Sequence, residues 1–197
     1  MIRGDRQKAT GNRKKNVPYC CLVSVAFCLV IFFLFTSVGW AGMAVQSCFS
    51  PAGRCSNHIV REIGQAQGEI LVAVYAFTSE ELAWALVKAR KRGVKVQVVL
   101  DKEFDKKNEN SKGPLLTQQG LQVRRISGAN TNKGDRESGL MHQKFAVIDR
   151  KVVLTGSYNW TVSAESLNDE NLLLFRDAGP LAEEYRREFL RLWERQR

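Results

Sequence analysis

The chain has 197 residues, which suits one ordinary domain plus an extra segment and excludes several large domains, since domains cluster near about 100 to 150 residues. Its formal net charge is +10, and residues 1–19 carry six basic side chains and one acid. The remainder keeps +5, from 24 basic and 19 acidic side chains. This excess favours a polyanionic partner, either nucleic acid or an anionic membrane surface, with a simple soluble basic protein as the alternative.

An uncharged run of 19 residues, from 20 to 38, follows the basic N-terminal segment. By the positive-inside tendency the basic flank stays cytoplasmic and the chain after the run is exported. A small-x-small site ends at Ala44. We therefore predict a signal peptide (1–44) and a mature domain (45–197) that is periplasmic or secreted. The run is also close to the length of about 20 residues that spans a bilayer, so a retained membrane anchor is the alternative.

Two of the five cysteines, Cys48 and Cys55, belong to the exported domain. In an oxidising compartment these two thiols are expected to form a disulfide. A zinc site would need both cysteines, His58 and a fourth ligand that the sequence does not identify, and structural zinc almost always has four protein ligands. We therefore predict a disulfide and no metal.

Apolar runs of strand length alternate with amphipathic stretches through the rest of the chain, which predicts an α/β fold. We expect helices over 56–67, 80–92 and 181–197, and strands over 70–77, 94–100, the apolar part of 141–149, 152–154 and 172–175. Ser79 has the residue type of an N-cap, and Gly93 that of a helix stop.

Two polar stretches, 101–113 and 127–139, are predicted as loops, and loops often carry function. Basic side chains stand in or beside the second loop: Arg124, Arg125, Lys133 and Arg136. They could line a phosphate-binding groove or simply keep a loop solvated.

The segment 141–149 reads M-H-Q-K-F-A-V-I-D, and its apolar end indicates a strand. Residues two apart on a strand share a face, so His142 and Lys144 can hold one phosphate between them. Asp149 has the opposite parity and is predicted as a support or turn residue.

A second polar segment, G-S-Y-N-W-T, starts at residue 156. Ser157 and Asn159 are again two apart and can present neutral hydrogen-bond donors on one side, although Gly, Ser and Asn also suit turns. Glu170 follows, just before an apolar run.

The order H-x-K-x4-D, then G-S-x-N, then an acid before Asn and an apolar strand resembles the phospholipase D superfamily, in particular its small bacterial endonuclease branch. The resemblance runs from about residue 48 to the C-terminus. It implies a mixed β-sheet flanked by helices on both faces, with one motif per chain.

The resemblance also implies a role for each motif residue. His142 matches the nucleophile that forms a covalent phosphohistidine. Lys144, Ser157 and Asn159 match the residues that hold the non-bridging oxygens. Glu170 matches the acid that bonds the far nitrogen of the histidine. No cofactor is implied, and cleavage is expected in EDTA.

The mechanism implied by the resemblance needs a second histidine to protonate the leaving oxygen, and the chain offers only His142 and the poorly placed His58. We therefore expect a homodimer in which two copies of His142 meet at the two-fold axis.

The substrate is harder to predict, because the motif indicates the reaction and not the substrate. The basic domain and the likeness to bacterial nucleases favour sequence-nonspecific cleavage of DNA, with Tyr158 or Trp160 either stacking on bases or lying in the core. The alternatives are a phospholipase acting on an anionic lipid such as cardiolipin, a mitochondrial membrane-anchored relative, and a non-catalytic nucleic-acid-binding module.

Overall fold

The central strands of this protein lie on the apolar runs of its sequence. The computed structural model describes residues 42–129 and 139–195. In chain order its elements are β1 (Ala44–Ser50), α2 (Cys55–Gln65), β2 (Glu69–Val74), α3 (Glu80–Lys91), β3 (Lys95–Asp101), α4 (Lys102–Lys107), α5 (Gly113–Gln118), β4 (Gln122–Ile126), β5 (Lys144–Ile148), β6 (Val152–Gly156), α6 (Val162–Ser166), β7 (Glu170–Arg176) and α7 (Gly179–Glu194).

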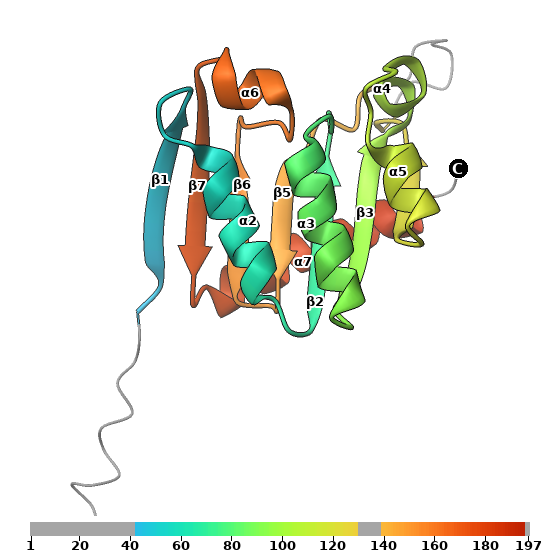
Figure 1. Cartoon of the computed structure of the whole chain (residues 1–197). Helices are drawn as coiled ribbons and strands as arrows, with labels where there is room; N and C mark the ends of the chain where they lie inside the picture. Colours follow the sequence, from blue (N-terminus) through green and yellow to red (C-terminus); the bar gives the residue numbers. More distant parts are fainter. Residues whose placement is uncertain (1–41, 130–138, 196–197) are drawn as a thin grey trace, which may run out of the picture. The chain divides into compact units, whose positions relative to one another are not determined.

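The strands form one seven-stranded mixed sheet in the order β1-β7-β6-β5-β2-β3-β4 (Figure 1). β2, β3 and β4 are parallel, whereas β5, β6, β7 and β1 are paired antiparallel. Lys144 pairs with Val74, and Gly156 pairs with Leu172. The start of β5, the end of β6 and the start of β7 therefore meet at the same end of the sheet.

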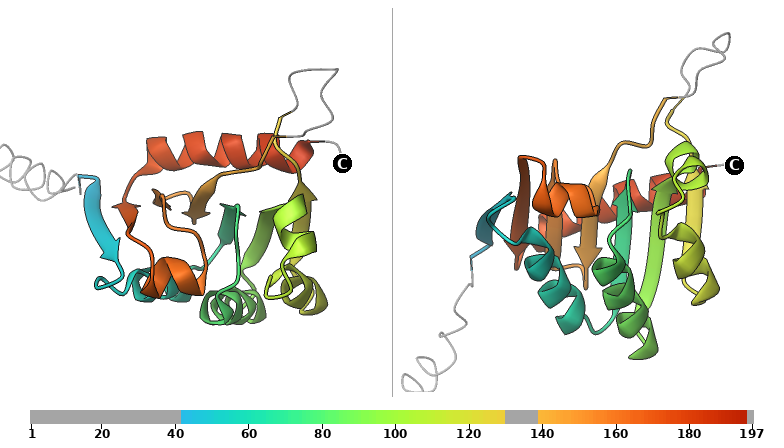
Figure 2. Two further views of the ribbon diagram at one scale, coloured as in Figure 1. Left: turned by 90° about the horizontal axis from the view of Figure 1, so that it is seen from above. Right: turned by 45° about the horizontal axis from the view of Figure 1, so that its top comes forward.

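Helices cover both faces of the sheet, as the resemblance implies (Figure 2). Alternation along β2 divides its side chains between two cores. Val72 packs with residues of α2 and α3, while Leu71 packs with residues of α7, including Phe189. Each fully buried side chain of this size contributes about 1.5 to 3 kcal/mol.

The helix α3 begins and ends as its sequence predicts. The Ser79 hydroxyl accepts a hydrogen bond from the backbone N–H of Leu82 at 3.3 Å, which caps the first turn. Gly93, just past the end, has φ of 95°, a conformation that favours glycine.

Several elements lie where we expected loops or assigned nothing. The stretch 101–113 is not a loop, because it contains α4 and the start of α5. The sequence also did not predict β1, β4 or α6. Helices of five or six residues are held by their surroundings more than by propensity, so their sequence signal is weak. β1 and β4 are the two edge strands, and their partly exposed residues lack a long apolar run.

A disulfide joins β1 to α2. Cys48 and Cys55 are bonded, with their Cα atoms 5.7 Å apart, and both side chains are buried. This bond uses the two thiols that a zinc site would need. Within 42–129 and 139–195, no group of three or more His, Cys, Asp or Glu side chains is placed to hold a metal.

The predicted signal or anchor run, 20–38, lies outside the described residues. Among the residues that are described, no helix has the length and apolar character to cross a membrane. Ala44 is the first residue of β1 and pairs with Arg176. Cleavage after Ala44 stays a prediction.

Candidate active site

The five residues that the motif predicts for catalysis meet in one pocket at the end of the sheet. The pocket has a volume of about 470 Å³ and is lined by His142, Gln143, Lys144, Thr155, Gly156, Ser157, Asn159 and Glu170. The antiparallel pairing of β5, β6 and β7 brings these segments together although they are up to 28 positions apart.

His142 precedes β5 by two residues, and its segment is fixed by two neighbouring strands. The backbone N–H of Tyr75 donates to the carbonyl of Gln143 at 2.8 Å. Asp101, buried at the end of β3, accepts from the N–H of Met141 at 2.9 Å. The imidazole lies against the ring of Tyr75, with centroids 4.8 Å apart. These contacts fix the backbone on both sides of the histidine.

Lys144 is the first residue of β5, and its ammonium lies beside His142. Its Nζ donates to the carbonyl of His142 at 2.8 Å and lies 5.5 Å from the ring centre of Tyr75. Among the described residues Lys144 makes no ion pair. Its remaining N–H donors can therefore bind an oxygen of a phosphate.

Ser157 and Asn159 lie on the segment after β6. The Ser157 hydroxyl accepts from the backbone N–H of Asn171 at 3.0 Å and from its Nδ2 at 3.3 Å. Because both bonds use the hydroxyl as acceptor, its own proton is free to donate to a substrate oxygen. The side-chain oxygen of Asn159 is buried and has no partner among the described residues.

Gly156 lets this segment pass close to β7. Its φ is 148°, and a Cβ at this position would lie 2.3 Å from the carbonyl oxygen of Asn171. Only glycine fits this close approach.

Glu170 lines the same pocket but does not make the expected hydrogen bond to His142. Its Oε1 instead accepts from Asn168 Nδ2 at 3.3 Å. Burial lowers the pKa of Lys144. The negative charge of Glu170 opposes this effect but is the smaller of the two. Catalytic hydrogen bonds are often unformed in structures without substrate, so the role of Glu170 stays a prediction.

The pocket favours an uncharged imidazole. Burial lowers the pKa of His142 below its usual value, and the positive charge of Lys144 lowers it further, while Asp101 opposes both. A neutral imidazole has a free lone pair and can attack phosphorus.

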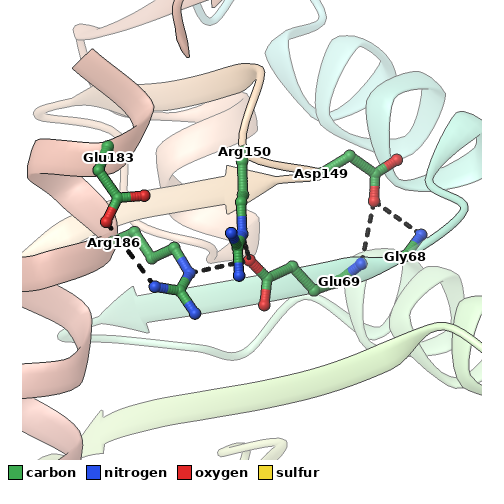
Figure 3. A network of polar contacts seen from close by, with 6 residues as sticks. All are labelled: Gly68, Glu69, Asp149, Arg150, Glu183 and Arg186. Carbon is green, nitrogen blue, oxygen red and sulfur yellow. Dashed lines mark hydrogen bonds and ion pairs between the residues drawn. The ribbon is translucent and has the colours of Figure 1, made fainter. Parts of the chain in front are cut away.

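Asp149 lies at the other end of β5 and supports the fold, as its parity predicts (Figure 3). Its carboxylate accepts from the backbone N–H groups of Gln67, Gly68 and Glu69 at 2.9, 2.7 and 2.9 Å. At about 3.3 Å per residue, the strand separates it from His142 by roughly 20 Å. Asp149 therefore ties the α2–β2 turn to the β5–β6 hairpin and does not touch the pocket.

A cluster of ion pairs lies beside this tie. Glu69 accepts from Nε of Arg150 at 3.2 Å and from Nε of Arg186 at 3.0 Å, so α7 is joined to the same corner (Figure 3).

The basic residues proposed for substrate binding do not line the His142 pocket. Arg124 donates to the carbonyl of Trp193 on α7 and lies over its ring. Arg125 pairs with the buried Asp105 and lines a separate pocket. Lys133 and Arg136 lie outside the described residues.

Trp160 is a core residue and offers no free face to a base. It is 2% exposed and packs edge-on against Phe77, with centroids 5.2 Å apart. Tyr158 is equally buried, and its hydroxyl donates to Glu165 at 2.6 Å. Both residues therefore lie in the core, the alternative to stacking on bases.

Asp101 and Tyr75 are site residues that the sequence pattern does not single out. Both stand at the carboxyl end of a buried strand, next to the pocket. The sequence marks them only as a polar or aromatic residue at the end of an apolar run. This signal is weak unless the order of the strands is known.

Comparison with known proteins agrees with this geometry. The family model described as cardiolipin synthase, PLD-like domain, matches residues 59–193. A mitochondrial cardiolipin hydrolase of Xenopus laevis is 36% identical over 160 residues, covering 76% of this chain and 71% of the relative. A phospholipase D of Rickettsia prowazekii is 38% identical over 142 residues, covering 72% of this chain and 63% of the relative.

Two solved structures share the fold. Nuc from Salmonella typhimurium, a phospholipase D family member, has a TM-score of 0.70 and 29% identity, and the match covers 79% of this chain and 97% of Nuc. NucT from Helicobacter pylori has a TM-score of 0.72 and 28% identity, with coverage of 77% and 96%. The chain therefore belongs to the phospholipase D superfamily and is a phosphodiester hydrolase of that superfamily.

Proposed function

We propose that this protein is a metal-independent nuclease that cleaves DNA without sequence specificity, through a covalent phosphohistidine on His142. The observation that carries the proposal is the pocket in which His142, Lys144, Ser157, Asn159 and Glu170 meet. The pocket holds a nucleophile of lowered pKa beside a fixed positive charge and neutral donors.

The proposed reaction has two steps. In the first, the neutral imidazole of His142 attacks phosphorus, and the leaving oxygen takes a proton from a second histidine. Lys144, Ser157 and Asn159 bind the non-bridging oxygens, whose charge grows in the transition state. In the second, the histidine that gave its proton takes one from water, and the hydroxide so formed attacks phosphorus and releases His142.

The second histidine comes from another copy of the chain in this proposal. His58 does not line the pocket; its Nδ1 lies 3.5 Å from Gln46 Nε2 on β1. We therefore propose a homodimer whose two-fold axis runs through the site, so that His142 of the partner subunit acts as the acid. Export by the N-terminal segment, with cleavage or with retention as a membrane anchor, is part of the same proposal.

Two features support nucleic acid as the substrate. The chain after residue 19 is basic, with a net charge of +5 from 24 basic and 19 acidic side chains. Nuc and NucT are two solved structures that this chain matches over nearly all of their own length.

A phospholipase acting on cardiolipin is the second candidate. Its support is the name of the Xenopus laevis relative, a mitochondrial cardiolipin hydrolase. Three apolar side chains around the site are also exposed, Leu140 by 54%, Val162 by 62% and Leu167 by 77%, and could touch a lipid surface. A non-catalytic nucleic-acid-binding module, the third candidate, leaves the five pocket residues without a role.

The deciding experiment incubates the full chain, purified in detergent, with plasmid DNA, single-stranded DNA, RNA and cardiolipin vesicles in EDTA. We expect DNA cleavage that falls by about 10³-fold or more in His142→Ala, because the nucleophile is lost. His58→Ala is the matched control and should keep its activity. Lipid turnover alone would support the phospholipase, and the absence of any turnover would support the binding module.

A further inference from the structure

A second pocket adjoins the catalytic one. It has a volume of about 710 Å³, within the range of about 300 to 1,000 Å³ that is usual for small-molecule sites. Asn159 lines both pockets, so the second one begins where the scissile phosphate would be held. Nothing in the proposed chemistry uses it.

An aromatic pair leads from the catalytic histidine into this pocket. The ring of Tyr75 lies 4.8 Å from that of His142 on one side and 5.3 Å from that of Phe104 on the other. Tyr75 and Phe104 both line the pocket, and both are only partly buried. Their rings therefore provide an apolar surface at the position next to the phosphate.

Besides the apolar side chains of Ala76, Val162 and Leu167, the remaining walls carry neutral hydrogen-bonding groups. Side-chain amides come from Asn108, Asn159 and Asn168, and a hydroxyl comes from Thr78. Asn159 lies between the two pockets, and its buried side-chain oxygen has no partner among the described residues.

The two charged side chains in the pocket oppose each other. Lys112 Nζ lies 3.9 Å from a carboxylate oxygen of Glu80, so the pair adds no net charge. A phosphate group would need an excess of positive charge here, and an acyl chain would leave the amides without partners. A flat heterocycle with several donors and acceptors satisfies both the rings and the amides.

We propose that this pocket binds the nucleobase of a nucleotide next to the scissile phosphate, with the base against Tyr75 and Phe104 and its edge on the amides. The inference rests on the proposed nuclease function and adds to it a preference for substrates whose bases are unpaired. A base in a duplex is stacked and paired, so it must leave the helix to enter a pocket.

The test uses short oligonucleotides with a single phosphodiester, all other linkages being methylphosphonates. Three versions carry bases throughout, an abasic residue on the 5′ side of the cleavable linkage, or one on its 3′ side. Stacking on an aromatic side chain is worth about 1 to 3 kcal/mol per base, so removing the base on one side should lower kcat/KM by about 5- to 150-fold. Equal cleavage of all three substrates by the unmodified protein would overturn the inference.

Two variants assign this preference to the pocket. Phe104→Leu keeps apolar bulk but removes the ring, and Asn108→Ala removes an amide. In each, the ratio of kcat/KM for the base-bearing and abasic substrates should fall by about fivefold or more. Phe49→Leu and Asn57→Ala, at exposed positions outside the pocket, are the matched controls and should keep the ratio.

The outcomes separate this inference from the proposed function. Absence of nucleic-acid cleavage in the unmodified protein would mean that the proposed nuclease function fails. If nucleic acid is cleaved but neither Phe104→Leu nor Asn108→Ala changes the ratio of kcat/KM for the base-bearing and abasic substrates, the base does not bind in this pocket, and the nuclease function stands. Variants that slow the hydrolysis of cardiolipin vesicles and leave the oligonucleotide ratio intact would assign the pocket to a lipid headgroup.

Discussion

At the scale of single residues, the pocket sets the charge of His142. Burial and Lys144 lower the pKa of the imidazole, so the neutral, nucleophilic form persists to lower pH than for a free histidine. We expect the acidic limb of kcat/KM against pH to have its midpoint below about 6.5, the usual histidine pKa. A midpoint at or above that value would contradict this account of the site.

Asp101 offers a test of this electrostatic balance. Its buried carboxylate accepts from the N–H groups of Phe104 and Met141, and its charge raises the pKa of His142. Asp101→Asn keeps the shape but removes the charge. The acidic midpoint should then move to lower pH, and kcat should fall because Met141 is held less firmly.

A purely structural role for Asp101 predicts a different result. Activity would then fall without any shift of the pH profile, and thermal stability would fall in parallel. The other charged groups near the imidazole, Lys144 and Glu170, are unchanged in this variant, so a shift can be attributed to Asp101.

The sequence predicts the pocket residues that lie close together in the chain and misses those that come from elsewhere. His142 and Lys144 could be predicted to act together because a strand places alternate residues on one face. Tyr75 and Asp101 lie 67 and 41 positions before His142, and only the order of the strands brings them to it. Trp160 shows the converse, since its residue type suits stacking on a base but its position is in the core.

At the scale of elements, Asp149 holds the β5–β6 hairpin to the α2–β2 turn. Burial raises the pKa of its carboxyl, but three backbone N–H donors outweigh this and hold the pKa below its usual value. Asp149→Ala leaves these donors without their partner and should lower the free energy of unfolding by about 1 to 2 kcal/mol. Denaturant unfolding measures this, and activity per folded molecule should be unchanged.

The pH dependence of stability gives a second readout for Asp149. Its pKa is lower in the folded than in the unfolded chain, where it is about 3.9. The stabilisation is therefore fully present above pH 3.9 and is lost as the pH falls through the lower folded value. The stability difference between the Ala variant and the unmodified protein should shrink over that range.

The disulfide links the end of edge strand β1 to the start of α2. Cross-linking a loop of this length, with Cys48 and Cys55 seven positions apart, stabilises by about 2.5 kcal/mol in the chain-entropy model. Reduction, or Cys48→Ser with Cys55→Ser, should therefore lower Tm. Ser50 of β1 pairs with Glu170, the first residue of β7, which lines the catalytic pocket. Loss of the disulfide should therefore also lower the activity near Tm. An unchanged Tm after complete reduction would rule out this role.

Elements with an apolar run or an apolar face could be predicted, whereas the short helices and the edge strands could not. α3 and α7 have apolar faces, and α3 has a capping residue. β2 is a continuous apolar run after Glu69, and β3 is mostly apolar and buried. The short helix α4 depends on contacts across the fold, such as that of its buried Asp105 with Arg125 on β4.

At the scale of the whole molecule, the proposed dimer predicts how activity depends on the proportion of unmodified and inactive chains in a mixture. If each site needs two copies of His142, a mixed dimer of unmodified and His142→Ala chains has no complete site. After subunit exchange of an equal mixture, we expect about one quarter of the activity of the unmodified protein at the same total concentration. If each subunit carried a complete site of its own, the mixture would keep about one half of the activity, which would contradict a site shared between two subunits.

One feature of β5 bears on how relatives of this protein are recognised. The eight-residue motif runs along the whole strand, so its His and Lys lie in the pocket while its Asp lies at the opposite corner, in the α2–β2 tie. Selection for turnover acts on the first two, and selection for a folded domain acts on the third. A descendant that has lost catalysis is expected to keep the aspartate and change the histidine, and a motif search that gives all three positions equal weight will count such a protein as an enzyme.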